Sequence, residues 1–181
     1  MRFIRYLFLL LIVVGAFSPL ETVRSQAGAT LSIQPVSVTA DHCSLPVITL
    51  RLDNVTDLTA YTVRLTFEPQ YLRVLEVSNG DFLKDEIPAP DNAIDNAAGT
   101  VRFGMARFGD DSPPESGSGA LVLLRVMALQ AGQTAHLTID TAETHLVGWP
   151  EGTAISYQAA DGIIYTGDCE ASETFLPLVL R

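Results

Sequence analysis

The sequence has little positive charge. Of its 181 residues, eleven are Lys or Arg and 21 are Asp or Glu, and Lys84 is the single lysine. Recognition of nucleic acid depends on a cluster of basic side chains, whereas the arginines here are scattered along the chain. The formal net charge of −10 therefore argues against a nucleic-acid-binding domain.

Recognisable catalytic motifs are also missing. The three histidines, His42, His136 and His145, lack H-E-x-x-H spacing. There is no G-x-S-x-G sequence and no glycine-rich loop that introduces a helix. The paired carboxylates Asp110 and Asp111 are interpreted as solvated loop residues. A chain of this length allows one medium domain, so we expect a non-catalytic single domain.

No apolar run is long enough to span a membrane, which takes roughly 20 residues. The N-terminal run from Tyr6 to Phe17 has twelve residues and is interrupted only by Gly15. It follows Arg2 and Arg5, and a basic segment before a short apolar core is typical of a signal peptide.

A small-residue cleavage site, Ala27-Gly28-Ala29, follows this core, and Ser25-Gln26-Ala27 is a possible alternative. The sequence therefore predicts a signal peptide over residues 1–29, with an uncleaved membrane anchor as the alternative. In both cases we expect the rest of the chain to be secreted or extracellular, or attached to the cell surface. Removing the leader takes away three arginines and one glutamate, which lowers the net charge from −10 to −12.

Cysteine is rare: the chain has only Cys43 and Cys169. An even number of cysteines in an oxidising compartment favours a disulfide. Both cysteines stand beside polar loop residues, which favours a bridge over the alternative of two free buried thiols. Closing so large a loop stabilises a domain by up to about 4–5 kcal/mol in the chain-entropy model.

Sustained helical periodicity is absent after Thr30, where short β-type runs alternate with turn residues. The clearest strand is Tyr61–Phe67, in which apolar residues alternate with Thr and Arg. The most apolar run, Ala120–Leu129, is interpreted as a buried strand, although periodicity alone leaves a short helix open. Eight or nine such segments favour an all-β sandwich or jelly roll.

Several segments, in order, carry a resemblance to a known family. They are Ala60–Pro69 with Leu72–Val77, Gly80–Leu83, Gly99–Ala106, Gly117–Leu121 and Asp161–Ile163. In these features the chain resembles the cohesin domain, the receptor module of cellulosome scaffolds. The resemblance implies a nine-stranded jelly-roll β-sandwich over residues 30–168, related in fold to cellulose-binding modules. It also implies a non-catalytic binding module acting in extracellular polysaccharide degradation.

Cohesins bind dockerin modules on a sheet face, so the resemblance implies a partner-binding face made of outward residues. These are Thr62, Arg64, Thr66, Arg102, Gly104, Ala106, Thr138 and Asp140. The best-known cohesin type carries an Asn and an Asp at two positions that read Ala60 and Thr62 here. We therefore expect a recognition code that differs from that type. An ordinary solvated sheet surface is the alternative interpretation of these residues.

Two further functions stay open. A carbohydrate-binding module on the same fold would stack sugar rings on Trp149 and Tyr157. Against this, the aromatics Tyr61, Phe67 and Phe103 fall on inward positions, and we expect Trp149 to cap the core. The other candidate function is a structural cell-surface domain.

No metal ligand set or cofactor motif stands out, and we expect no cofactor. Residues 91–96 are rich in Asp and Asn, and a weak calcium site there is the alternative. The segment departs from the EF-hand pattern because Ala93 occupies the third ligand position, so the chain carries no dockerin of its own. The tail, 169–181, contains the apolar run Phe175–Leu180, which indicates either a sorting or attachment segment or a final edge strand.

Overall fold

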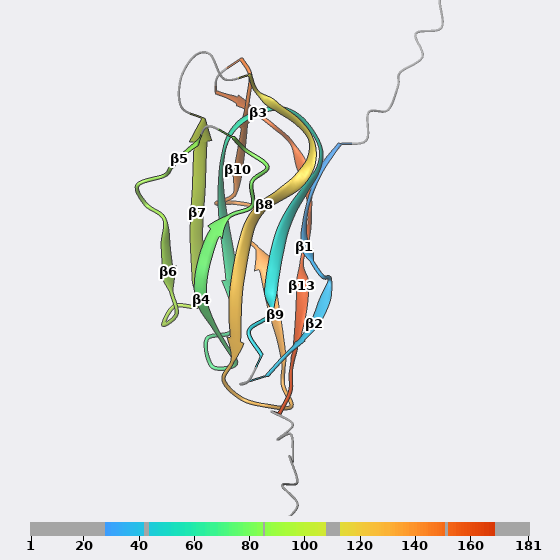
Figure 1. The fold of residues 1–181 in the computed structure, drawn as a ribbon, viewed down its shortest axis with the longest axis vertical. Helices are drawn as coiled ribbons and strands as arrows, with labels where there is room; N and C mark the ends of the chain where they lie inside the picture. Colours follow the sequence, from blue (N-terminus) through green and yellow to red (C-terminus); the bar gives the residue numbers. More distant parts are fainter. Residues whose placement is uncertain (1–27, 42–43, 85, 108–112, 151, 169–181) are drawn as a thin grey trace, which may run out of the picture.

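The computed structural model describes residues 28–41, 44–84, 86–107, 113–150 and 152–168. Within these ranges all regular structure is β-strand, arranged in two packed layers (Figure 1). The predicted jelly-roll β-sandwich is confirmed. The strands are β1 (Ala29–Gln34), β2 (Ser37–Ala40), β3 (Val47–Phe67), β4 (Leu72–Asn79), β5 (Glu86–Pro88), β6 (Ala93–Asp95), β7 (Thr100–Arg107), β8 (Glu115–Ala128), β9 (Thr134–Ile139), β10 (His145–Gly148), β11 (Thr153–Ala154), β12 (Tyr157–Ala160) and β13 (Gly162–Thr166).

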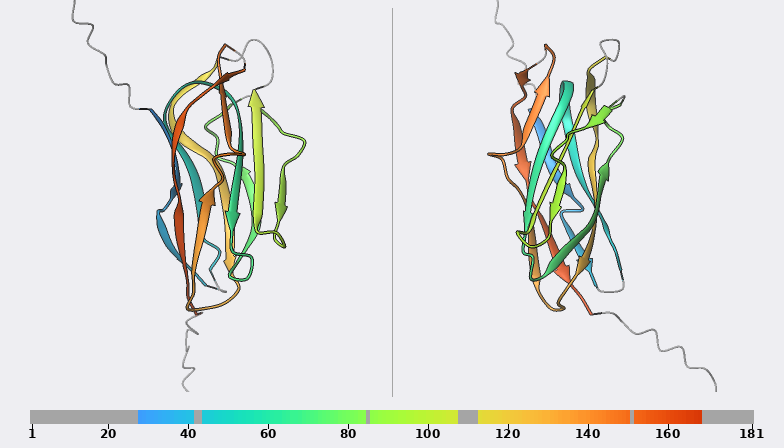
Figure 2. Two further views of the ribbon diagram at one scale, coloured as in Figure 1. Left: turned by 180° about the vertical axis from the view of Figure 1, so that it is seen from behind. Right: turned by 90° about the vertical axis from the view of Figure 1, so that its left-hand side faces the viewer.

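Strand pairing defines the two layers. The first layer runs β12, β1, β3, β8, β4, and all of its pairs are antiparallel except β12 with β1. In the second layer the C-terminal half of β3 pairs with β7 on one side and with β9 and β10 on the other. The short strands β5 and β6 extend this layer beyond β7, while β13 and β2 extend it beyond β9 (Figure 2).

The long strand β3 belongs to both layers, because it bends and changes partners near its middle. Two residues at the bend, Asn54 and Asp57, have positive φ angles of 58° and 55°. Their backbone N–H groups donate to the hydroxyls of Ser118 (3.0 Å) and Ser116 (2.8 Å). The register between β3 and β8 shifts around these residues, which marks β-bulges. The two β8 serines supply hydrogen bonds in place of the strand-to-strand bonds that the bulges remove.

The core lies between the layers and is made of alternate residues on each strand. Tyr61, Val63 and Leu65 are buried on β3, whereas the residues between them are half-buried on the outside. The predicted alternating strand is thus confirmed. The apolar run Ala120–Leu129 lies in β8 over all but its last residue, so it forms a strand and not a helix.

The main departures from the sequence interpretation concern short strands. The strand predicted over 61–67 is the C-terminal part of a longer strand, β3, which begins at Val47. Residues 82–99 contain two strands that were not predicted, β5 and β6, of three residues each. Segments this short carry no periodicity of their own, and they form because β7 offers an open edge for pairing.

Several predictions fall on residues that the structure does not describe: most of the signal peptide, both cysteines of the predicted disulfide, and the tail 169–181. Within the described part of the chain, no helix is long and apolar enough to cross a membrane. The first strand begins at Ala29, which is buried against the core. Cleavage at the alternative site, after Ala27, would leave this strand whole.

Candidate functional site

The residues predicted for partner binding come together on the outer surface of the second layer. We call these eight residues the β3–β7–β9 face, which turns toward the viewer in the left panel of Figure 2. Register places Thr62 opposite Gly104, Arg64 opposite Arg102 and Thr66 opposite Thr138. Ala106 lies farther along β7, and Asp140 directly follows β9. The side chains project outward because their neighbours along each strand are buried.

Two arginines face each other at the centre of this face, and like charges directly opposite destabilise a strand pair. Three carboxylates offset the repulsion. Arg64 Nε lies 3.8 Å from Asp140 Oδ2, and Arg102 Nη1 lies 3.5 Å from Glu143 Oε2. The Nε of Arg102 also pairs with Asp91. The centre of the face is therefore a half-exposed network of two cations and three anions.

The turn after β9 positions two of these acids. Asp140 accepts a hydrogen bond from the Ala142 N–H at its side chain (3.1 Å) and from the Glu143 N–H at its carbonyl (3.2 Å). The Asp140 N–H donates to the Arg64 carbonyl (2.9 Å), and the Arg64 N–H donates to the Thr144 hydroxyl (3.0 Å). Both backbone groups of Arg64 are thus bonded to this turn, which fixes Asp140 and Glu143 beside the arginines.

The segment before β6 positions the third acid. The side-chain amide of Asn92 accepts from the Gly104 N–H (2.7 Å) and donates to the Gly104 carbonyl (3.1 Å). A Cβ at Gly104 would lie 3.2 Å from Ala89 Cβ and 2.8 Å from the Tyr61 carbonyl oxygen. Gly104 is consequently buried, with Ala89 and the Tyr61 carbonyl close to it. The other seven residues of the face are partly exposed and can contact a partner.

A calcium site over 91–96, the alternative to the expected absence of a cofactor, would compete with hydrogen bonds already made. Asn92 Oδ1 accepts from β7, and Asn96 Oδ1 accepts from the Val74 N–H (2.8 Å). Asp95 Oδ1 caps the N–H groups of residues 97 and 98, both at 2.9 Å. In the described ranges, no group of three or more His, Cys, Asp or Glu residues is arranged to hold a metal ion.

The two aromatics of the carbohydrate alternative differ in accessibility. Trp149 is 54% exposed and does not cap the core as expected. The alternation of β10 explains this, because His145 and Val147 point outward and Trp149 falls on the same side. Tyr157 is half-buried, and its hydroxyl donates to the Thr144 carbonyl (3.0 Å). Of these two aromatics, Trp149 alone therefore offers an open ring.

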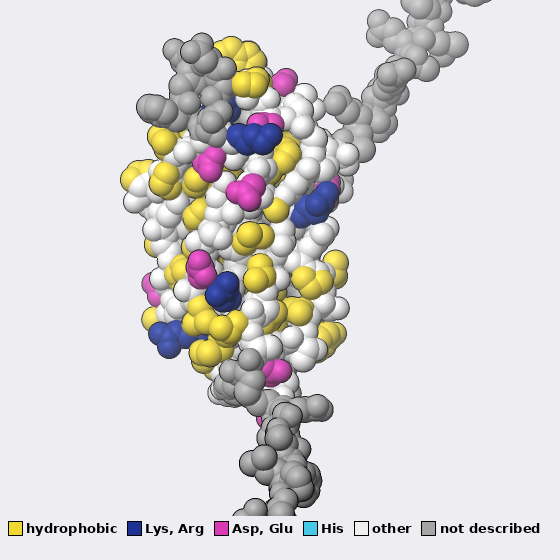
Figure 3. Space-filling view, in the orientation of Figure 1, with side chains coloured by type: hydrophobic (Ala, Val, Ile, Leu, Met, Phe, Trp, Pro, Cys, Tyr) yellow, Lys and Arg dark blue, Asp and Glu magenta, His cyan; other side chains and the backbone are white. Residues whose placement is uncertain are grey.

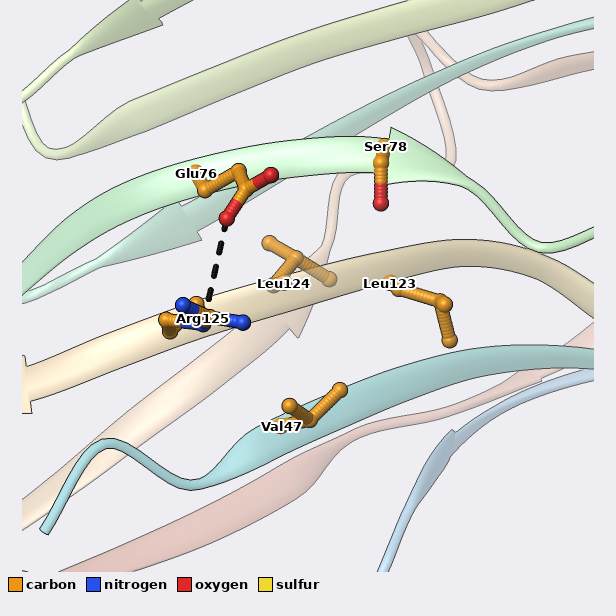
Figure 4. Close-up of a pocket in the computed structure, with 6 residues that line it drawn as sticks. All are labelled: Val47, Glu76, Ser78, Leu123, Leu124 and Arg125. Carbon is orange, nitrogen blue, oxygen red and sulfur yellow. Dashed lines mark ion pairs between the residues drawn. The ribbon is translucent and has the colours of Figure 1, made fainter.

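The outer surface of the first layer carries a shallow depression between β3, β8 and β4 (Figure 4). Its lining is Val47, Glu76, Ser78, Leu123, Leu124 and Arg125. Hydrophobic and charged side chains are interspersed over this surface (Figure 3). The charged groups at the depression pair with each other, with Arg125 Nε 3.8 Å from Glu76 Oε2.

Sequence reasoning missed two acids of the central network and one residue, His145, that borders the face. Asp91 and Glu143 stand in loops, where no periodicity marks a residue as part of a face. His145 lies opposite Thr62 on β10, a four-residue strand too short to recognise by pattern. A hydrophilic residue next to a turn is the only signal that these positions carry, and many other positions share it.

No family model matches the sequence, and no curated protein matches it. The fold, however, matches solved cohesin structures. A non-cellulosomal cohesin from Archaeoglobus fulgidus aligns with a TM-score of 0.62 at 16% identity, covering 77% of this chain and 91% of that one. The third ScaC cohesin of Acetivibrio cellulolyticus, solved with the ScaB dockerin, aligns with a TM-score of 0.63 at 17% identity over 77% and 99%. The chain therefore has a cohesin-like fold, as the sequence resemblance predicted.

Proposed function

We propose that this protein is a non-catalytic cohesin-like module that docks a dockerin-type protein outside the cell, in polysaccharide degradation. The observation that carries the proposal is the β3–β7–β9 face, whose residues three strands bring together on one surface. Solved structures with this fold include cohesins in complex with dockerins. Paired strands with half-exposed Thr and Arg side chains suit a macromolecular partner better than a small molecule.

The partner should differ from the dockerins of the best-known cohesin type. Ala60 and Thr62 stand where that type has an Asn and an Asp that hydrogen-bond the dockerin. A partner group left without its hydrogen bond in a buried interface costs about 1–3 kcal/mol. Dockerins suited to the Asn and Asp should therefore bind this chain weakly.

The direct test is calorimetric titration of the purified protein with a panel of dockerin modules, with and without calcium. The panel should include the ScaB dockerin of Acetivibrio cellulolyticus. Binding by at least one dockerin, weakened by Arg64→Glu with Arg102→Glu, would support the proposal. The matched control is Arg51→Glu, because Arg51 is equally exposed at 38% and pairs with Asp53 on the other layer. If no dockerin binds, or if the control weakens binding as much, the proposal fails.

The exposure of Trp149 keeps a carbohydrate-binding function as a second candidate. An exposed indole can stack on a sugar ring. Retention of the protein on cellulose and other polysaccharides, lost in Trp149→Ala but kept in the arginine double variant, would establish this second function. If the protein were retained on none of these polysaccharides, the carbohydrate-binding function would be excluded.

A further inference from the structure

Arg64 lacks a hydrogen-bond acceptor for one of its buried guanidinium atoms. Its Nε is buried and has no hydrogen-bond partner among the described residues. The carboxylate of Asp140 is 3.8 Å away, which is beyond hydrogen-bond length. The Nε atoms of Arg102 and Arg107 are likewise buried without a hydrogen-bond partner in the described part of the chain, but the guanidinium of Arg102 forms ion pairs with two acids, Asp91 and Glu143. Arg64 is thus the less compensated cation of the pair.

This arrangement is costly in the free protein. A buried donor without an acceptor costs about 1–3 kcal/mol, and more when the group is charged. Repulsion from Arg102 directly opposite adds to the cost. The backbone of Arg64 cannot shift to relieve it, because both its N–H and its carbonyl are bonded to the turn at Asp140–Thr144. An external acceptor would remove both penalties at once.

We propose that Arg64 and Arg102 together bind a single carboxylate, an Asp or Glu side chain of the docked protein. This inference rests on the proposed function and adds the chemistry of the partner. A guanidinium forms strong, bidentate hydrogen bonds with a carboxylate. One carboxylate between the two arginines screens the like-charge pair, and rotation of the partly exposed Arg64 side chain brings its Nε to the same acceptor.

The surrounding charges limit the partner further. Asp91, Asp140 and Glu143 border the arginine pair on two sides. The whole chain also carries a net charge of −10. These three carboxylates would repel a polyanion such as a phosphate-rich or sulfated polymer. The matching partner surface therefore has one central acid with neutral or basic groups around it.

The first experiment reads the guanidinium directly. We would record the arginine side-chain Nε–Hε signals by NMR and titrate the protein with the peptide acetyl-Gly-Glu-Gly-amide. The same peptide with Gln in place of Glu controls for charge. We expect a saturable shift of the Arg64 signal with the Glu peptide only, and no shift at Arg51, which already pairs with Asp53 at 2.9 Å. An unshifted Arg64, or equal shifts at Arg51, would overturn the inference.

The second experiment uses any dockerin that binds in the titration panel. Arg64→Gln should weaken its binding about ten-fold or more, since the charge-assisted bond is lost. Arg64→Lys should restore only part of the affinity, because an ammonium cannot bind in bidentate geometry. Arg51→Gln should leave affinity unchanged, and thermal melts would confirm that all three variants fold.

The two proposals fail in different ways. If a dockerin binds Arg64→Gln and the wild type with equal affinity, the carboxylate inference is wrong. The docking function would still be supported by that binding. A specific response to the Glu peptide without binding of any dockerin would do the opposite: the face would recognise acids, and its partner would be another class of protein.

Discussion

The hydroxyl oxygen of Tyr61 lies 2.8 Å from the carbonyl oxygen of Leu121, so a side chain of β3 donates a hydrogen bond to β8 in the opposite layer. The same hydroxyl lies 3.0 Å from Asn79 Oδ1 on β4. Asn79 in turn donates to Glu86 (2.9 Å). A polar connection therefore crosses the core and reaches the edge strand β5.

Removing this hydroxyl should destabilise the fold. Tyr61→Phe keeps the ring but removes one hydrogen bond to the Leu121 carbonyl, which still accepts from the Gly80 N–H (2.9 Å), so the expected cost is about 0.5–1.5 kcal/mol. Chemical denaturation of the variant would measure the change in free energy of unfolding. Tyr165→Phe is the matched control, because Tyr165 is 48% exposed and its variant should stay within about 0.5 kcal/mol of the wild type. Equal stability of the Tyr61 variant and the wild type would refute the role of the bond.

The same tyrosine should make stability depend on pH in alkaline solution. Burial, with a smaller contribution from Glu86, raises the pKa of Tyr61 far above its ordinary value. Above the ordinary tyrosine pKa of about 10, the unfolded chain loses this proton while the folded chain keeps it. The free energy of unfolding should therefore fall more steeply with rising pH in the wild type than in Tyr61→Phe. Urea titrations between neutral pH and pH 11 would show it, and parallel curves would contradict it.

The sequence alone predicted which side of its clearest strand faces the core. The alternation in Tyr61–Phe67 assigns Thr62 and Arg64 to the outside, since side chains on a strand alternate between its two faces. The family resemblance supplied the choice of strands. Together they were enough to place all of the predicted binding residues on one face.

The charge network could not be predicted in this way. It depends on the register that puts Arg64 opposite Arg102, and a shift of one residue would turn the Arg64 side chain inward. It also depends on turns that bring Asp91 and Glu143 to the arginines from distant parts of the chain. Pairing of remote segments leaves no local signature in the sequence, so this part of the site required the structure.

Gly99 should tolerate no side chain. It has a positive φ of 68°, and a Cβ there would clash with the Phe67 carbonyl oxygen and approach Pro69 Cδ to 2.8 Å. Gly132 provides a matched comparison, since its φ is 70° but nothing lies within 4 Å of the added Cβ. Gly132→Ala should cost about 1–2 kcal/mol from backbone strain alone. Gly99→Ala should cost clearly more in the same denaturation assay, and an equal cost would show that the clash is relieved.

The disulfide between Cys43 and Cys169 stays a prediction, because both cysteines lie outside the described residues, and only the strands that precede them can be compared. β2 and β13 pair in parallel with Ala40 opposite Thr166, and each cysteine follows three residues after its member of this pair. The Gly167 N–H also donates to the Ala40 carbonyl (2.8 Å). β2 and β13 therefore lie side by side at Ala40 and Thr166, the last residues of the two strands.

Peptide mapping without reductant should recover the two cysteines in one cross-linked fragment. Replacing both with serine should lower the free energy of unfolding by up to about 4–5 kcal/mol. Labelling of two free thiols in the denatured, unreduced protein purified from an oxidising compartment would show that the bridge does not form.

Asn92 should hold the arginine network in place indirectly, because its side-chain hydrogen bonds go to Gly104 and position the neighbouring Asp91. The Asn92 amide makes two hydrogen bonds to Gly104 and so holds Asp91 against Arg102. Asn96 makes an equivalent pair of bonds to Val74 on β4, away from the arginines. Asn92→Ala and Asn96→Ala should therefore lose similar stability, on the order of 1–3 kcal/mol.

Only Asn92→Ala should also move the Nε–Hε signal of Arg102, because Asp91 is then free to leave it. The signal of Arg125, whose partner is Glu76 on the other layer, should stay in place in both variants and serves as the internal control. If Asn96→Ala moved the Arg102 signal as far as Asn92→Ala did, the change would reflect general loosening of the sandwich. The specific role of Asn92 in positioning Asp91 would then be wrong.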